Sequence, residues 1–125
     1  MKRVHITNQT RPLQCALQAR YCADFPCRLR GLTFRRTLAA EQGLLLVQER
    51  ENRLDAAIHM LFVCMDLAVI WIDAEGRVVD RCLAKAWRPM YVPRQAAQYV
   101  LEIIPTRLAE FEVGDRLKFE DTFLD

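Results

Sequence analysis

The apolar positions of the chain gather in short runs, and the longest of them is His59–Asp73 (HMLFVCMDLAVIWID). Both halves of this run are rich in branched and aromatic side chains without strict alternation, which is typical of strands covered on both faces. Asp66 lies near the middle, and aspartate is depleted in strands and frequent in turns. We therefore predict two core strands, IHMLFV and LAVIWID, joined at Cys64–Asp66.

A membrane-spanning helix does not fit the same run. Counted from Ala56 to Ile72, the run is shorter than the roughly 18–20 apolar residues that such a helix needs. Asp66 near its centre would also cost a few kcal/mol in lipid. We therefore expect no membrane partner and place the run in the core of a globular protein.

Turn signals separate the remaining runs. The residues Asp73–Gly76 indicate a hairpin, the charged segment Arg50–Ala56 indicates a loop, and the two prolines of Trp87–Pro93 indicate a surface crossing rather than a central strand. Apolar runs between such signals predict further strands at Lys2–Thr7, Gln14–Cys22, Gly43–Glu49, Val78–Ala86, Ala97–Ile104 and Arg116–Asp121.

Two segments predict short helices. In DFPCRLRGL, Asp24 can cap the first turn, Pro26 suits that turn and Gly31 can end the helix. In PTRLAEFEVGD, Thr106 can cap and Gly114 can end the helix. The elements together predict a mostly β protein, a single-domain antiparallel sandwich or barrel with two short helices, over residues 1–125.

Overall charge says little about partners. The net charge is +2, from 18 basic and 16 acidic residues, and such a balance predicts neither nucleic acid nor an anionic membrane. Basic residues do cluster at Arg28, Arg30, Arg35 and Arg36. We interpret this cluster as a solvated face rather than a phosphate site.

The cysteines bear on the compartment. Their number is odd, and none shows the C-x-x-C spacing of a zinc site or redox motif. We predict that all five are reduced and that the protein is cytoplasmic; the start, MKRVHITNQT, has no apolar segment of a secretory signal. The five are Cys15, Cys22, Cys27, Cys64 and Cys82.

Five segments occur in a characteristic order along the chain. They are RLRGLTFR (Arg28–Arg35), EQGLLLV (Glu41–Val47), HMLFVCMDLAVIWIDAEGRVV (His59–Val79), YVLEI (Tyr99–Ile103) and VGDRLKF (Val113–Phe119). Together they resemble the uncharacterised bacterial and archaeal family called domain of unknown function 192. The resemblance covers about Gln14–Glu120 and implies a compact, mostly β fold of the jelly-roll or barrel kind, but it implies no reaction.

The chain departs from the family pattern at several positions. Thr33 stands where the family's arginine-glycine-leucine run continues with methionine. Many members read tryptophan-methionine-lysine-asparagine-threonine at His59–Val63, with a proline and an aspartate a little further on. If those polar groups form a family site, this chain has lost much of it, because apolar residues replace them at Leu61, Phe62, Val63 and Ala68.

His59 and Glu102 are the candidate chemical groups. A lone histidine opening an apolar run is usually a hydrogen-bonded rim residue, but it could line a pocket and change charge near neutral pH. Glu102, the polar residue of YVLEII, needs a cation on an apolar face. Arg30 or Arg35 could supply a structural ion pair; the alternative is an acid or base with a shifted pKa in a cleft.

Two functional hypotheses remain open. The first is a non-catalytic domain that binds an unknown small molecule or partner protein in a rim cleft. The second is a small hydrolase or transferase with Glu102 or His59 as general acid or base. A serine nucleophile is excluded because the chain contains no serine, and with only His5 besides His59 we expect no metal or cofactor. The proposed cleft residues are Arg35, His59, Trp87 and Arg88.

Overall fold

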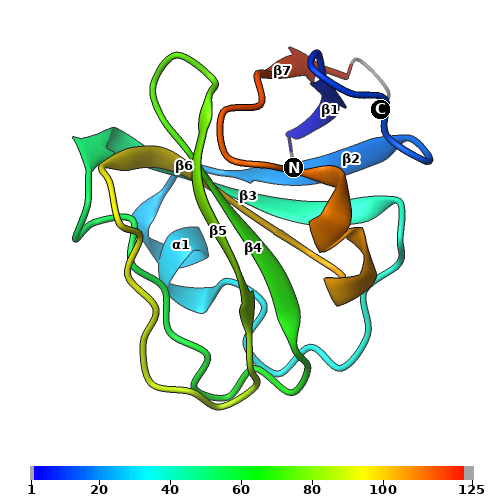
Figure 1. The fold of residues 1–125 in the computed structure, drawn as a ribbon. Helices are drawn as coiled ribbons and strands as arrows, with labels where there is room; N and C mark the ends of the chain where they lie inside the picture. Colours follow the sequence, from blue (N-terminus) through cyan, green and yellow to red (C-terminus); the bar gives the residue numbers. More distant parts are fainter. Residues whose placement is uncertain (1, 123–125) are drawn as a thin grey trace.

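A computed structural model describes residues 2–122, and the strands in this range form one seven-stranded sheet (Figure 1). Its spatial order is β5-β4-β6-β3-β2-β1-β7. The strands are β1 (Arg3–Asn8), β2 (Leu17–Cys22), β3 (Gln42–Asn52), β4 (Leu67–Ile72), β5 (Val78–Ala84), β6 (Ala97–Ile103) and β7 (Leu117–Asp121). An α-helix, α1 (Phe25–Arg30), and a 3-10 helix, η1 (Pro105–Glu110), complete the described elements, so the mostly β fold with two short helices is confirmed.

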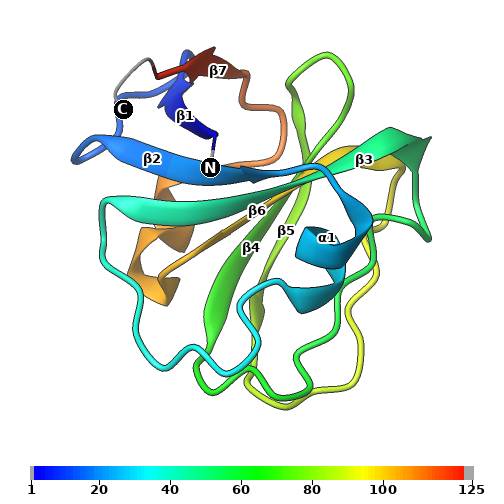
Figure 2. The ribbon, with the colours of Figure 1, turned by 180° about the vertical axis from the view of Figure 1, so that it is seen from behind.

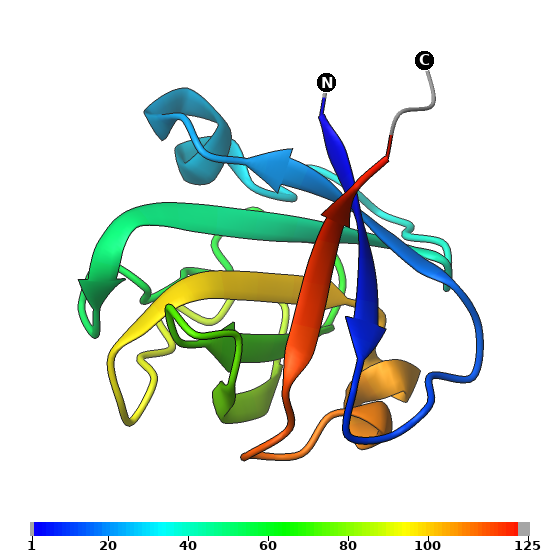
Figure 3. The same cartoon turned by 90° about the horizontal axis from the view of Figure 1, so that it is seen from above.

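The sheet is mixed rather than purely antiparallel, and it is not closed into a barrel. β2 and β3 pair in parallel, which requires a crossover, and α1 with the following loop supplies it. β1 and β7 run side by side and cross steeply over the other strands (Figure 3). Between the two ends of the sheet, the pairing that the described residues show is a single bridge, Arg77↔Arg116.

Both faces of the central strands are buried. Leu45, Ile70 and Leu101 pack into one apolar cluster, while Leu44 and Val69 pack into a second cluster on the opposite face. Every residue of β4 is buried. This two-sided burial explains why the sequence of LAVIWID shows no alternation of apolar and polar positions.

The two halves of the His59–Asp73 run differ in structure. LAVIWID forms β4 as predicted, but the predicted strand IHMLFV is wrong. That segment is irregular, and it is held to the proline-interrupted crossing by the bridge Ile58↔Tyr91 and by hydrogen bonds between Met60 and the backbone of residues 87 and 88. Phe62 has φ 64°, which no extended strand contains.

Smaller differences concern element ends. β3 continues to Asn52, so the predicted loop at Arg50–Ala56 begins inside a strand. Asp24 caps α1 as predicted, since its carboxylate accepts a 2.8 Å hydrogen bond from the Cys27 amide. Thr106 does not cap η1: the N-cap position is Ile104, and the turn is 3-10 rather than α-helical.

The cysteines are not all reduced. Cys22, at the end of β2, and Cys27, in α1, form a disulfide with their Cα atoms 5.6 Å apart. The prediction of five free thiols is therefore wrong for this pair, and the cytoplasmic location inferred from it stays a prediction. Cys15, Cys64 and Cys82 are free.

Candidate functional site

Glu102 lies in the middle of the sheet, on an otherwise apolar face. It belongs to β6, between Leu44 of β3 and Val69 of β4. Its side chain shares their face of the sheet, and the residue is only 5% exposed. Among residues 2–122, no hydrogen bond or ion pair to this carboxyl group is found, although buried carboxyl groups are normally paired.

The carboxyl group borders a cavity of about 590 Å³ that opens to the surface. One wall is α1 with the following turn at Gly31–Thr33, and another is the irregular segment around Ile58, His59 and Val63. Figure 2 shows α1 standing in front of the sheet on this side. The parallel β2–β3 crossover thus places a helix over the strand that carries Glu102.

Local sequence explains why α1 stands there. The Asp24 cap and Pro26 begin the helix at a defined residue, and the disulfide fastens Cys27 to the end of β2. Arg28 reaches across to β3 and donates a 3.2 Å hydrogen bond to the Val47 carbonyl. The wall of the cavity is therefore attached to the sheet at two points.

Burial raises the pKa of Glu102 to about 7. The cause is the loss of hydration, which disfavours the charged carboxylate. Near neutral pH both forms are populated, so this group can donate a hydrogen bond when protonated and accept one when ionised. A carboxyl group with this property suits either ligand recognition or proton transfer.

Cationic side chains line the same cavity towards its mouth. Arg50 lies 3.9 Å from Asp55 in an exposed ion pair, whereas the guanidinium of Arg30 has no partner within the described part of the chain. His59 is also exposed there. The cavity lining therefore carries both signs of charge, since Glu49 and Asp55 lie beside the arginines, and Arg30 is the arginine without a partner among the described residues.

The structure brings together some of the predicted site residues and separates others. Arg30, His59 and Glu102 line one cavity, but Arg35 lines a second cavity of about 460 Å³. Trp87 and Arg88 line neither of the two. The four-residue rim cleft proposed from the sequence is therefore not formed as a single cavity, and neither candidate ion pair of Glu102, with Arg30 or with Arg35, is present in the described range.

Arg28 and Arg50 are cavity residues that sequence reasoning did not assign to the site. The sequence indicates Arg28 only as part of a basic cluster and predicts a loop at Arg50. No local pattern links either of them to Glu102, because their proximity arises from the crossover between β2 and β3.

One group of carboxylates has the spacing of a metal site. In the described range, oxygens of Glu51, Asp73 and Glu75 lie within 4.8 Å of one another. Hydrogen bonds already account for two of them, because Glu51 accepts from the Ala74 amide at 2.7 Å and Asp73 accepts from the Arg77 amide at 2.9 Å. We interpret the group as the contact between the end of β3 and the turn of the β4–β5 hairpin.

Fold and cavity define a class: a small, mostly β protein with one mixed sheet and a cavity between that sheet and a short helix. Over residues 4–119 the sequence matches the family DUF192, "Uncharacterized ACR, COG1430". The chain belongs to this family, as its resemblance to domain of unknown function 192 predicts. Among residues 2–122, no helix is both long and apolar enough to cross a membrane.

Relatives support the same assignment. The "UPF0127 protein TK1120" of Thermococcus kodakarensis is 36% identical over 119 residues, covering 94% of this chain and 74% of the relative. The "UPF0127 protein PF1050" of Pyrococcus furiosus is 34% identical over 115 residues, covering 90% and 95%. A crystal structure from Sinorhizobium meliloti, named "putative transcription regulator", superposes with a TM-score of 0.82 at 21% identity, covering 94% and 92%. The last likeness concerns the fold alone.

Proposed function

We propose that this protein is a non-catalytic domain that binds a small polar molecule in the Glu102 cavity. The observation that carries the proposal is a carboxyl group that is almost fully buried, lacks a partner among the described residues, and borders an open cavity. The carboxyl oxygens of Glu102 are open to the cavity, since no fully buried side-chain oxygen lacks a partner among the described residues. A ligand in the cavity can therefore reach them and form a hydrogen bond in a largely apolar surrounding, where such a bond is strong.

Size and charge narrow the class of ligand. A volume of about 590 Å³ lies within the usual range of small-molecule sites. Arg30, whose guanidinium has no partner among the described residues, favours an anionic group, while Glu102 favours a hydroxyl or amine. Hydroxy acids, amino acids and phosphorylated metabolites combine these features, and we propose a ligand of this kind.

Binding can be tested with the variant Glu102→Gln, which keeps the shape of the side chain and removes its charge. A thermal-shift screen of small carboxylates and phosphates on the wild-type protein identifies a ligand, and calorimetry measures its affinity. We expect Glu102→Gln to bind at least about tenfold more weakly, since a charge-assisted hydrogen bond contributes roughly 1.5–3 kcal/mol. Equal affinity in the two proteins would exclude Glu102 from the site.

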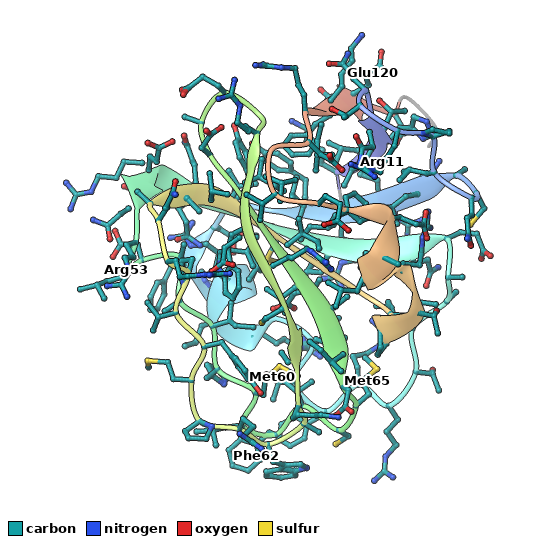
Figure 4. The ribbon with its side chains drawn as sticks, in the orientation of Figure 1. Arg11, Arg53, Met60, Phe62, Met65 and Glu120 are labelled. Carbon is teal, nitrogen blue, oxygen red and sulfur yellow. A yellow bond between two sulfur atoms is a disulfide. The ribbon has the colours of Figure 1, made fainter. Side chains whose placement is uncertain are left out.

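Glu120→Gln is the matched control. Glu120 is an exposed glutamate of β7, at the opposite end of the molecule from Phe62 (Figure 4). Its 3.6 Å ion pair with Lys118 is a surface pair, which contributes little to stability. We expect the Glu120 variant to bind the ligand as the wild-type protein does.

The second candidate function is general acid or base catalysis in a hydrolase or transferase. The observation that favours it is the pKa of Glu102, because a catalytic group works best with a pKa near the working pH. A panel of ester, amide and glycoside substrates would reveal turnover with a pH–rate transition near 7 that disappears in Glu102→Gln. Turnover that persists in this variant with the same pH profile would remove Glu102 as the acid or base.

A further inference from the structure

Three aromatic side chains form an exposed cluster at one end of the molecule. Phe34, Phe62 and Trp87 come from three separate loops, and their ring centroids lie 5.5 Å (Phe34–Phe62) and 5.3 Å (Phe62–Trp87) apart. Phe34 is 72% exposed and Trp87 is 53% exposed. Figure 4 shows Phe62 at the lower tip, opposite the β1–β7 end. We call these three residues the aromatic tip.

The backbone holds the aromatic tip in an unusual conformation. Phe34, Phe62 and Trp87 have φ of 65°, 64° and 68°, and in the described range they are the non-glycine residues with positive φ. Bulky residues rarely adopt this conformation, and strain of this kind concentrates at functional sites. The Phe34 amide donates to the Phe62 carbonyl at 2.7 Å, and the Trp87 amide donates to the Met60 carbonyl at 2.9 Å. The three loops are thus tied together with their rings pointing outwards.

Apolar and basic side chains surround the aromatic tip. Leu61 and Met90, next to it in the chain, are also exposed. Arg35, Arg36 and Arg88 follow Phe34 and Trp87 directly in the sequence, and all three are exposed. Within residues 2–122 none of these arginines forms an ion pair with an acidic side chain. This end of the molecule is therefore both apolar and positively charged.

The shape and charge of the aromatic tip indicate what kind of partner binds to it. None of the aromatic-tip residues lines either of the two cavities, and Figure 4 places Phe62 at the outer end of the molecule, which favours contact with a flat surface over a peptide. A second copy of the chain would bring Arg35, Arg36 and Arg88 against a like-charged surface, which disfavours self-association. An anionic lipid surface accepts protruding aromatic side chains at headgroup level and attracts a basic rim.

We propose that the aromatic tip docks this protein onto an anionic phospholipid surface. The rings of Phe34, Phe62 and Trp87 enter the interfacial region, and Arg35, Arg36 and Arg88 face the lipid phosphates. The proposal is that the protein adsorbs to the membrane surface, without a segment that spans the membrane. It differs from our expectation, drawn from the balanced net charge, that the protein has no membrane partner. A net charge of +2 conceals three exposed arginines, Arg35, Arg36 and Arg88, beside the aromatic tip.

Tryptophan fluorescence provides a direct test, because the two tryptophans differ in exposure. Trp71 is 1% exposed, so Trp87 reports on the tip. Vesicles of equal parts phosphatidylcholine and phosphatidylglycerol should shift the emission to the blue, and lipids brominated near the headgroup should quench it. In Trp87→Phe the remaining emission comes from Trp71, and the spectral response should vanish.

Co-sedimentation with the same vesicles measures the partition coefficient of variants. Each arginine near an anionic surface contributes about fivefold, so Arg35→Ala/Arg36→Ala/Arg88→Ala should bind on the order of a hundredfold more weakly. Phe62→Asn, which suits positive φ, should also weaken partitioning. The controls Leu54→Ser and Arg77→Ala change an exposed apolar and an exposed basic residue outside the tip, and they should leave partitioning unchanged.

Three results would overturn the proposal. The first is no blue shift and no co-sedimentation at low salt. The second is equal binding to vesicles of phosphatidylcholine alone, because the basic rim would then have no role. The third is a dimer in ultracentrifugation that the Phe62 variant dissociates, since the tip would then be an interface between copies of the chain.

Discussion

Glu102 combines two properties that rarely occur together in a folded protein: the residue is only 5% exposed, and its carboxyl group, which is open to the cavity, lacks a partner among residues 2–122. The sequence identified this residue as exceptional because it is the polar member of the apolar strand YVLEII. The predicted ion pair of Glu102 with Arg30 or Arg35 is absent from the described residues. Whether an arginine faces β6 depends on the path of the chain after β2. That path depends on packing and leaves no periodic signal in the sequence.

We expect the Glu102→Gln variant to change the pH dependence of stability. Because the pKa rises from its ordinary 4.5 to about 7 on folding, the native state binds this proton more tightly than the unfolded chain. The associated stability is present below pH 4.5 and is lost as the pH rises through 7, in total about 3 kcal/mol. Glutamine stays neutral, so the variant should match the wild-type protein at pH 4.5 and exceed it by up to about 3 kcal/mol at pH 8.

Chemical denaturation at the two pH values measures this difference. Glu120→Gln, whose side chain is exposed, serves as the control and should follow the wild-type protein at both. A Glu102 variant that differs from the wild-type protein by the same amount at pH 4.5 and pH 8 would contradict a titrating carboxyl group at this position.

Among the elements, IHMLFV and LAVIWID show what periodicity can and cannot decide. Their compositions are similar, yet only LAVIWID lies between two complete strands, β5 and β6. The other faces a crossing in which Pro89 and Pro93 lack an amide hydrogen, so a continuous ladder cannot form. The hairpin at Asp73–Gly76 and the Asp24 cap follow from local residues and are confirmed, whereas the predicted Thr106 cap is wrong. The parallel β2–β3 pair depends on a crossover and was not predicted.

The disulfide allows a prediction about α1. Closing the short loop between Cys22 and Cys27 should contribute about 2 kcal/mol in the chain-entropy description. Reduction should therefore lower the denaturation midpoint and speed amide exchange in α1 and Gly31–Thr33, one wall of the Glu102 cavity. Hydrogen exchange followed by mass spectrometry, with and without a thiol reductant, measures the effect.

The matched variants for this experiment are Cys27→Ser and Cys15→Ser. Cys27→Ser removes the disulfide, so the reductant should have no further effect on it. Cys15 is an exposed free thiol, and its variant should respond to the reductant as the wild-type protein does. Exchange in α1 that is the same before and after reduction would show that the disulfide does not restrain the helix.

For the molecule as a whole, acidic groups with opposite pKa shifts should place maximal stability near pH 5. Burial alone would raise the pKa of Asp115, but hydrogen bonds from Arg11 and Asn8 outweigh it and lower the pKa. Burial would likewise raise the pKa of Asp80, but hydrogen bonds from Arg94 outweigh it and lower that pKa. Stability from these two groups is present above pH 3.8 and is lost as the pH falls, whereas that from Glu102 is lost as the pH rises.

Melting temperatures between pH 3 and pH 8 check this expectation, which places the maximum well below the isoelectric point of about 8.4. The wild-type protein should decline on both sides of the maximum. In Glu102→Gln the decline on the alkaline side should be reduced while the acid side is retained. A maximum at the isoelectric point would contradict it.

The order of the strands has a consequence for biosynthesis. β1 lies between β2 and β7, so it pairs with a strand that leaves the ribosome much later than it does, as in the register Val4↔Asp121. Until Asp121 has emerged, the outer side of β1 presents unpaired amides and carbonyls, which can recruit strands from other nascent chains. A translational pause before β7 would prolong this exposure, and a chaperone would be needed most during that interval.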